Sequence, residues 1–190
     1  LPESLINKIA AGEVVERPSS VVKELIENSI DSGATEININ VKNGGKDLIS
    51  IIDNGCGMSK KDAKLSFQRH ATSKINLEED LFKINTLGFR GEALAAIASV
   101  SHFELLTCDN QNQSGSRLYI KGGNLEEEGK VGFPKGTKIS VEKLFYNTPA
   151  RKKFLKTTAT EIKHIQQHFI QKSLSHPNIH FLLTHNKQIL

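Results

Sequence analysis

Residues 21–31 read VVKELIENSID, and this stretch predicts the helix on which the rest of the fold is arranged. At about 100° per residue, Glu24, Asn28 and Asp31 fall on one face of that helix. Glu27 lies beside them. The residues of the opposite face are apolar, namely Val22, Leu25, Ile26 and Ile30. The spacing therefore predicts one buried apolar stripe and one face of carboxylates and an amide.

Spacing alone leaves two interpretations of the polar face open. It fits the solvated side of an ordinary amphipathic helix, which is the commoner case. It also fits a site, because Asn is unfavourable in the middle of a helix and Asn28 needs a reason to be there. Its amide oxygen suits Mg²⁺, which takes few protein ligands and completes its shell with phosphate and water. Glu24, one turn earlier, can orient and deprotonate a water molecule.

Composition sets the bounds of the problem. The 190 residues suit one domain with its own core, and 25 Lys and Arg against 21 Asp and Glu leave a charge of +4, which permits contact with phosphates without requiring it. Two cysteines, Cys56 and Cys108, are too few for a disulfide framework and favour a reducing compartment. No apolar run approaches the roughly 18 residues that cross a bilayer, and no signal peptide is visible, so no membrane contact is expected. Because the chain starts at Leu1 rather than Met, we expect that a few residues precede it.

Outward from residues 21–31, the pattern predicts an α+β order of elements. A short helix is expected over 2–15, Pro18 ends it, and Ser19 or Ser20 caps the next helix, which runs to about Ser32. Strands are predicted over 36–41, 48–52, 101–108, 116–121, 125–131, 136–142 and 179–184, and helices over 59–67, from about 91, and over 148–156 and 159–174. Since strands and helices do not alternate regularly, the fold is predicted as a mixed, mostly antiparallel sheet with helices packed on one face.

The segment Asp53 to Gly57 reads DNGCG and directly follows a predicted strand. A carboxylate at a strand end can accept a hydrogen bond from an exocyclic amine such as that of adenine. The two glycines would let the backbone approach the base closely. The same residues also fit an ordinary turn after a strand.

Two further segments suit phosphate groups. Residues 88–94 read GFRGEAL, a glycine-flanked turn that leads into a helix, where free N–H groups can bind an anion. Residues 69–87 form a long polar stretch typical of a lid, in which Lys74 can meet a phosphate. A plain loop-to-helix junction and a solvated loop fit these segments as well. The usual P-loop is absent, because the nearest match, 123–130, has the wrong spacing and carries three glutamates.

Four motifs in order resemble the GHKL ATPases, a superfamily that includes type II topoisomerase subunits, a heat-shock chaperone family, histidine kinases and MutL mismatch-repair proteins. They are Glu24-x-x-x-Asn28, Asp53-x-Gly55-x-Gly57, the turn over 88–92 and Gly136–Thr137. Three further stretches resemble MutL in particular: IAAGEVV at 9–15, GFRGEAL at 88–94 and FYNTPAR at 145–151. The resemblance covers essentially the whole chain and identifies residues 1–190 as an N-terminal GHKL ATPase domain of MutL type, with the Bergerat-type ATP-binding fold.

The resemblance implies a role for each matching residue. Glu24 resembles the general base, and Asn28 the Mg²⁺ ligand at the nucleotide. Asp53 resembles the carboxylate that reads adenine, with Gly57 against the base and Thr137 beside Asp53. The remaining nucleotide-binding residues would be Thr72 and Lys74 in the lid and the backbone amides of Gly88, Phe89, Arg90, Gly91 and Glu92 around the phosphates.

The implied function is Mg²⁺-dependent ATP binding and slow hydrolysis that gates dimerisation and contact with partners and DNA in DNA mismatch repair. The implied partners are ATP, a MutS-type mismatch-recognition protein, a second copy or a paralogue, and DNA, bound weakly and mainly through regions beyond this chain. Such a protein works in the cytoplasm of a bacterium or the nucleus of a eukaryote. Family members continue into a second α/β domain, which supplies a lysine to the γ-phosphate, and a dimerisation domain. We therefore expect low activity from residues 1–190 alone.

Two alternative functions remain open at this point. The chain could bind nucleotide or DNA without turnover, or it could belong to another GHKL enzyme, although the stretches at 88–94 and 145–151 argue against the latter. A basic run, Arg151, Lys152, Lys153 and Lys156, could touch DNA phosphates, but a solvated helix face fits it better. His164 and His168 have a metal-binding spacing but no third ligand, so no zinc site is expected.

Overall fold

The structure is a computed structural model, and it describes residues 12, 14–67, 92–111 and 114–190. Within these residues one sheet of eight strands has the order β5-β4-β3-β6-β2-β1-β7-β8. Its strands are β1 (Glu36–Lys42), β2 (Leu48–Asp53), β3 (His102–Cys108), β4 (Gly115–Lys121), β5 (Asn124–Val131), β6 (Gly136–Glu142), β7 (His180–His185) and β8 (Gln188–Ile189). The pair β1–β7 is parallel and the other neighbours are antiparallel, which confirms the predicted mixed, mostly antiparallel sheet.

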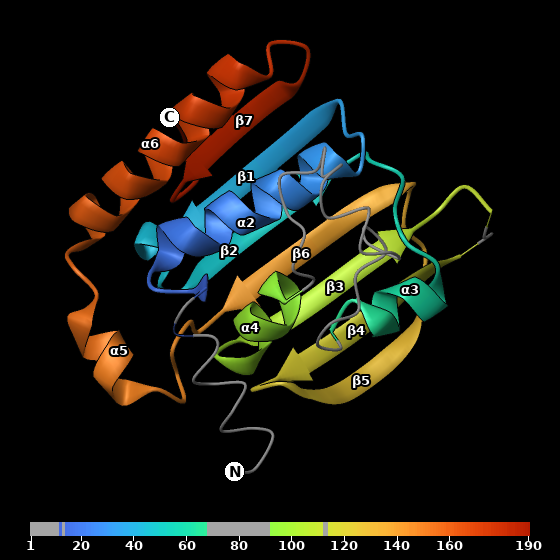
Figure 1. Cartoon of the computed structure of the whole chain (residues 1–190), viewed down its shortest axis with the longest axis horizontal. Coiled ribbons are helices and arrows are strands. Elements are labelled where there is room, and N and C mark those ends of the chain that lie inside the picture. Colours follow the sequence, from blue (N-terminus) through green and yellow to red (C-terminus); the bar gives the residue numbers. More distant parts are fainter. Residues whose placement is uncertain (1–11, 13, 68–91, 112–113) are drawn as a thin grey trace, which may run out of the picture.

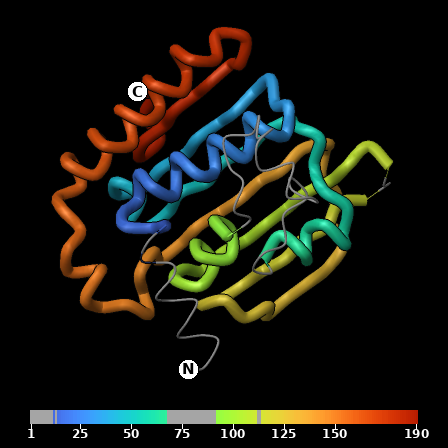
Figure 2. Tube along the Cα trace, viewed as in Figure 1, coloured from blue at the N-terminus to red at the C-terminus, as the bar shows by residue number. Residues whose placement is uncertain are grey.

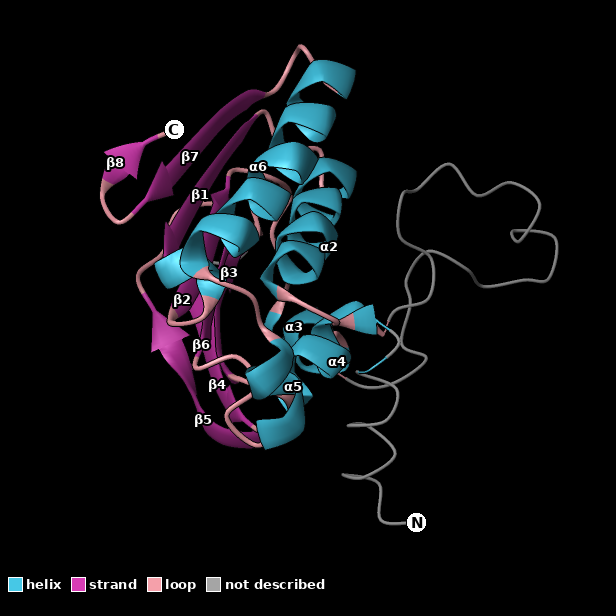
Figure 3. Ribbon diagram, turned by 90° about the vertical axis from the view of Figure 1, so that its left-hand side faces the viewer, coloured by secondary structure: helices cyan, strands magenta, loops and turns pink. Residues whose placement is uncertain are grey.

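The described helices form a second layer. They are α2 (Pro18–Asp31), α3 (Lys60–Leu65), α4 (Ala93–Ser99), α5 (Pro149–Phe154) and α6 (Thr158–Ser175), with a 3₁₀ turn, η1 (Asn43–Gly45), between β1 and β2. Figure 3 shows α2, α3, α4 and α6 on one side of the sheet, which confirms the predicted layering. None of the described helices combines the length and apolar character needed to cross a membrane.

The start of α2 differs from the prediction. Pro18 is the first residue of the helix and does not end a preceding one, while Arg17, with extended backbone, is the N-cap and makes no side-chain capping bond. Proline fits this position because its missing N–H would have no partner in the first turn. Ser19 and Ser20 therefore lie inside the helix rather than at its cap. The predicted helix over 2–15 falls largely outside the described residues.

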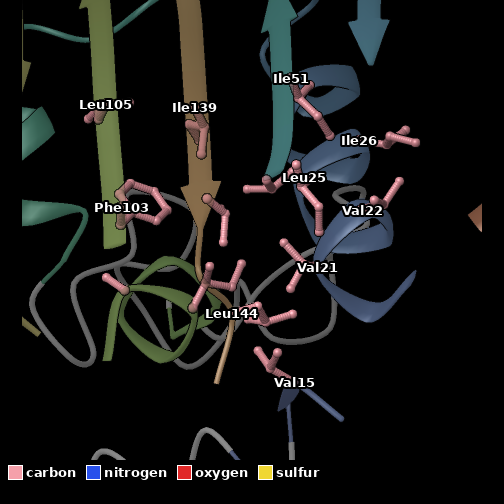
Figure 4. Close-up of a cluster of buried hydrophobic side chains, with 14 of the residues drawn as sticks. Val15, Val21, Val22, Leu25, Ile26, Ile51, Phe103, Leu105, Ile139 and Leu144 are labelled. Carbon is pink, nitrogen blue, oxygen red and sulfur yellow. The ribbon is translucent and has the colours of Figure 1, made fainter. Parts of the chain in front are cut away.

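The apolar stripe predicted for α2 is part of the hydrophobic core. Three of the four residues predicted for the apolar stripe are buried: Val22, Leu25 and Ile26. The fourth, Ile30, is half-buried. Figure 4 shows Val22, Leu25 and Ile26 in one cluster with side chains of β2, β3 and β6, among them Leu105. Burial of each such side chain stabilises the fold by about 1.5 to 3 kcal/mol. The pairing of α2 with the sheet is thus set by its apolar stripe.

After β6, the chain passes through α5 and returns as α6, which lies beside α2 (Figures 1 and 2). The strand β8, which the sequence pattern did not predict, follows β7 through a tight turn in which Asn186 and Lys187 both have positive φ. Its two residues are too few to show a strand alternation. The consequence for the site is that α6 flanks α2 within the single helical layer that covers this face of the sheet.

Candidate functional site

The candidate site forms where the C-terminal half of α2 meets the end of β2. Ser29 Oγ donates a hydrogen bond of 2.8 Å to Asp53 Oδ2, and both residues are buried. Asn28 directly precedes Ser29 and Glu24 lies one turn before Asn28, so this bond fixes the helix that carries both residues to the end of β2. Glu24 and Asn28 are half-buried, so they are neither core residues nor freely solvated.

Asp53 is the most constrained residue of the site. Besides the bond from Ser29, its Oδ1 accepts the backbone N–H of Gly55 at 3.0 Å. Burial raises the pKa of the Asp53 carboxyl above its ordinary 3.8, and the hydrogen bonds from Ser29 and from the backbone of Gly55 and Thr137 oppose that rise. A carboxylate can accept about four hydrogen bonds, so Asp53 keeps acceptor capacity for an outside donor. An exocyclic amine such as that of adenine fits this capacity.

The neighbouring strands add two hydroxyl groups beside Asp53. In the ladder β2–β6–β3, Asp53 is paired with Thr137, and Thr137 with Thr107. The two threonine hydroxyls lie 3.0 Å apart, and Thr107 Oγ1 accepts the backbone N–H of Met58 at 2.9 Å. The end of the sheet therefore presents a carboxylate and a pair of hydroxyls held by the backbone of the turn after β2.

Two functional candidates, Ser29 and Thr107, are absent from the sequence-based prediction. Ser29 lies on the same helical face as Leu25 and Ile26, where an apolar residue is expected. Thr107 lies on the inward side of β3, in step with Leu105. The sequence could have indicated both residues, because each is a polar residue at a position where the pattern expects an apolar one. A polar group buried there needs a hydrogen-bond partner.

Glycines let the backbone close around this site. Gly136 has φ of +129°, and a Cβ there would overlap the carbonyl group of Asp53. Gly57 has φ of +68°, and its Cβ would overlap the carbonyl of Cys108. Close packing of two backbones thus explains both glycines without a ligand. The contact of Gly57 with a base stays a prediction.

Glu24 has a mixed electrostatic environment. Burial raises the pKa of its carboxyl above the ordinary 4.5, Lys23 opposes the rise, and Glu27 adds to it. The Nζ of Lys23 lies 3.5 Å from Glu24 Oε1. A carboxylate whose pKa lies above its usual range is a better proton acceptor, which suits a general base.

The placement of Glu27 corrects the helical-wheel prediction. It is buried, and its Oε1 lies 2.6 Å from the Nζ of Lys172 on α6. The sequence placed it beside the solvated polar face of the helix. It is instead covered because α6 packs along that flank of α2, which no pattern within residues 21–31 can indicate.

The described residues contain no group of three His, Cys, Asp or Glu side chains arranged to hold a metal ion. The donors present fit Mg²⁺ better than a metal that needs a protein cage, because Mg²⁺ is often held by one or two protein oxygens and substrate phosphates. The half-buried amide of Asn28 is such a donor. Its position next to Ser29, the residue that binds Asp53, is compatible with the predicted ligand role.

Not all of the predicted nucleotide-binding residues are among those that the structure describes. Thr72, Lys74, Gly88, Phe89, Arg90 and Gly91 lie outside the described residues, as does the whole stretch 69–87. Glu92 is described, and it is the N-cap residue of α4, where its carbonyl accepts the N–H of Ala96 at 2.9 Å. The phosphate-binding turn therefore stays a prediction, although the helix that follows it is confirmed.

The basic run divides between exposed and half-buried positions. Lys152, Lys153 and Lys156 are exposed on and just after α5, whereas Arg151 is half-buried. The guanidinium of Arg151 lies so close to Gly12 that a Cβ there would overlap it. One side chain of the run thus packs against Gly12, and the other three remain accessible.

Comparison with known proteins gives a consistent result. Residues 16–146 match the family model described as "Histidine kinase-, DNA gyrase B-, and HSP90-like ATPase". The chain is 53% identical over 190 residues to the DNA mismatch repair protein MutL of Syntrophotalea carbinolica, covering 100% of this chain and 30% of that protein. It is 55% identical over 183 residues to MutL of Streptococcus agalactiae serotype III, covering 96% and 28%. The chain thus spans about 30% of the length of such relatives.

Solved structures agree with this match. The Aquifex aeolicus MutL ATPase domain complexed with ADP superposes with a TM-score of 0.76 and 32% identity, covering 93% of this chain and 62% of that one. The N-terminal domain of a DNA repair protein gives a TM-score of 0.80 at 27% identity, covering 95% and 52%. The α+β architecture with helices on one face is therefore shared with these domains.

Proposed function

Because the chain belongs to the histidine kinase-, DNA gyrase B- and HSP90-like ATPase family and resembles MutL over its whole length, we propose that it binds Mg²⁺-ATP at the α2–β2 site and hydrolyses it slowly. The observation that carries this proposal is the Ser29–Asp53 hydrogen bond. It ties the buried carboxylate to the helix that bears Glu24 and Asn28.

The order of groups along α2 matches the order of groups in the nucleotide. Asp53 of β2 and Thr137 of β6 lie at the end of the site nearest the C-terminal half of α2. Asp53 would accept a hydrogen bond from the adenine amine, and Thr137 would help to hold the adenine and its bound water. Asn28 follows toward the N-terminus and would hold Mg²⁺, which neutralises phosphate charge when bound. Glu24 lies about 7.5 Å along the axis from Ser29, at a rise of about 1.5 Å per residue. The general base, Glu24, thus lies further toward the N-terminus of α2 than the proposed adenine site, at the position where the terminal phosphate would lie.

The proposed chemistry is in-line attack of water on the γ-phosphorus. Glu24 accepts the proton of the attacking water, and the half-buried surroundings of its carboxyl favour that role. Thr72, Lys74 and the backbone of 88–92 would close over and cradle the phosphates. Positioning and charge neutralisation dominate such a reaction.

At the level of the whole protein, the proposal is that the ATP cycle gates dimerisation, with a second copy or a paralogue, and contact with a MutS-type protein and DNA. Similarity to MutL repair proteins supports this role. The exposed lysines 152, 153 and 156 support weak contact with DNA phosphates. A function at DNA puts the protein in the cytoplasm if its source is a bacterium, as for these relatives.

Single-turnover release of γ-phosphate tests the proposal. The chain, the full-length protein encoded by its gene, and Glu24→Ala in the full-length protein are compared. We expect Glu24→Ala to bind ATP but to lose turnover, and residues 1–190 alone to turn over well below the full-length protein. Asp47→Ala, an exposed carboxylate at the opposite end of β2, is the matched control and should keep turnover.

Two outcomes would contradict parts of this proposal. Normal turnover by Glu24→Ala contradicts its role as the base. Tight ATP binding by the full-length protein without phosphate release would favour the second candidate function, a nucleotide-responsive binding module. The half-buried position of Glu24 beside Lys23 favours hydrolysis over that alternative.

A further inference from the structure

A nearly buried ion pair joins α2 to α6. The Nζ of Lys172 lies 2.6 Å from Glu27 Oε1, and the two side chains are 13% and 8% exposed. Figures 1 and 3 show the two helices side by side along this contact. A carboxylate with so little access to water needs a partner, and breaking such a pair from one side leaves an uncompensated charge. Lys172 is therefore the group that neutralises Glu27.

Lys23 lies between Glu27 and the proposed base. Its Nζ is 3.5 Å from Glu24 Oε1 and 4.0 Å from Glu27 Oε1, so one ammonium group faces two carboxylates. His168 of α6 lies near both lysines, and burial together with Lys23 and Lys172 lowers the pKa of its imidazole. At neutral pH it is therefore uncharged and does not compete with either lysine for a carboxylate.

We propose that Lys23 is a positioning residue for Glu24, and that Lys172 keeps it in that role by neutralising Glu27. This inference rests on the proposed role of Glu24 as the base. Lys23 restrains a flexible carboxylate at 3.5 Å, which favours a single geometry toward the attacking water.

Glu24 and Glu27 compete for the ammonium group of Lys23, and Lys172 affects Glu24 through this competition. With Lys172 in place, Glu27 already has a partner at 2.6 Å, and Lys23 sits closer to Glu24. Without Lys172, Glu27 becomes the more buried and unpaired of the two carboxylates. Lys23 then moves toward Glu27, which is already within 4.0 Å at i, i+4, and Glu24 loses its restraint.

Steady-state kinetics of the full-length protein test this arrangement. We expect Lys23→Met and Lys172→Met each to lower kcat about tenfold while the KM for ATP stays unchanged, because the restraint acts on the catalytic base and not on the nucleotide. Adding Glu27→Gln to Lys172→Met should restore kcat, since the competing carboxylate is gone. Lys172→Arg should keep kcat, and Lys163→Met, an exposed lysine on α6, is the matched control.

The outcomes separate this inference from the proposed function. If Glu24→Ala is inactive while Lys23→Met has normal kcat, the positioning role is overturned and the base stands. If Glu24→Ala itself turns over normally, the proposed function fails. An equal loss of kcat in Lys172→Met and in its double variant with Glu27→Gln overturns the competition. Should Lys172→Met not fold, Lys23→Met still decides, because Lys23 is 43% exposed and its loss leaves Glu27 paired.

Discussion

Ser29→Ala removes the only side-chain hydrogen bond that the described residues donate to Asp53. Ser29 is 2% exposed and Asp53 9%, so water cannot easily replace the lost donor. A buried hydrogen bond to a charged group contributes about 1.5 to 3 kcal/mol, and we expect a loss of that size at neutral pH. For a protein of this size each kcal/mol lowers Tm by about 2 to 4 °C.

The loss should depend on pH, and its sign follows from Asp53. Burial raises the pKa of this carboxyl, so the stability that it contributes is fully present below its ordinary 3.8 and is lost as pH rises through the raised value. Ser29 offsets part of that loss by donating to the ionised form. Ser29→Ala should therefore cost most near pH 7 and least below pH 3.8, where Asp53 is protonated in both states.

Chemical denaturation at several pH values measures this effect. Ser99→Ala is the matched control, because Ser99 is also 2% exposed and donates at 2.8 Å to the neutral carbonyl of Ala96. Ser99→Ala should lower the free energy of unfolding by about 0.5 to 1.5 kcal/mol at every pH. If the two variants lose equal stability at pH 7, or if the loss in Ser29→Ala does not change with pH, the reasoning about Asp53 is refuted.

Three further predictions concern the same site. Asn28→Ala is expected to remove the Mg²⁺ dependence of ATP affinity in titration calorimetry, and an unchanged dependence would contradict its role as a ligand. Asp53→Asn is expected to weaken ATP binding at least about tenfold, because both Asp53 oxygens already accept hydrogen bonds and the NH2 of Asn would face one of those donors or the adenine amine; wild-type affinity would exclude that contact. Gly136→Ala is expected to cost more than about 1 kcal/mol, because its Cβ overlaps the Asp53 carbonyl, whereas Gly129→Ala, in open space, should be near neutral; equal melting temperatures would contradict this packing argument.

Local sequence patterns were sufficient to predict most of the helices and strands of the fold. The apolar stripe of Val22, Leu25 and Ile26 predicted both the helix and the face that it buries, because helical periodicity is a property of neighbouring residues. Strand alternation located most of the sheet in the same way. The start of α2 was predicted wrongly because Pro18 followed by two serines suits either a helix boundary or a first turn. Local signals of equal strength cannot choose between these positions.

The sequence by itself determined which residues carry the proposed chemistry, since Glu24, Asn28 and Asp53 stand in motifs of recognisable spacing. Only the tertiary structure decided what surrounds them. Ser29 reaches Asp53 across 24 positions of the chain, and Lys172 covers Glu27 from a helix formed more than a hundred residues later. These partners are set by the packing of α2 on the sheet and beside α6, and that packing depends on contacts between distant segments that no local pattern records.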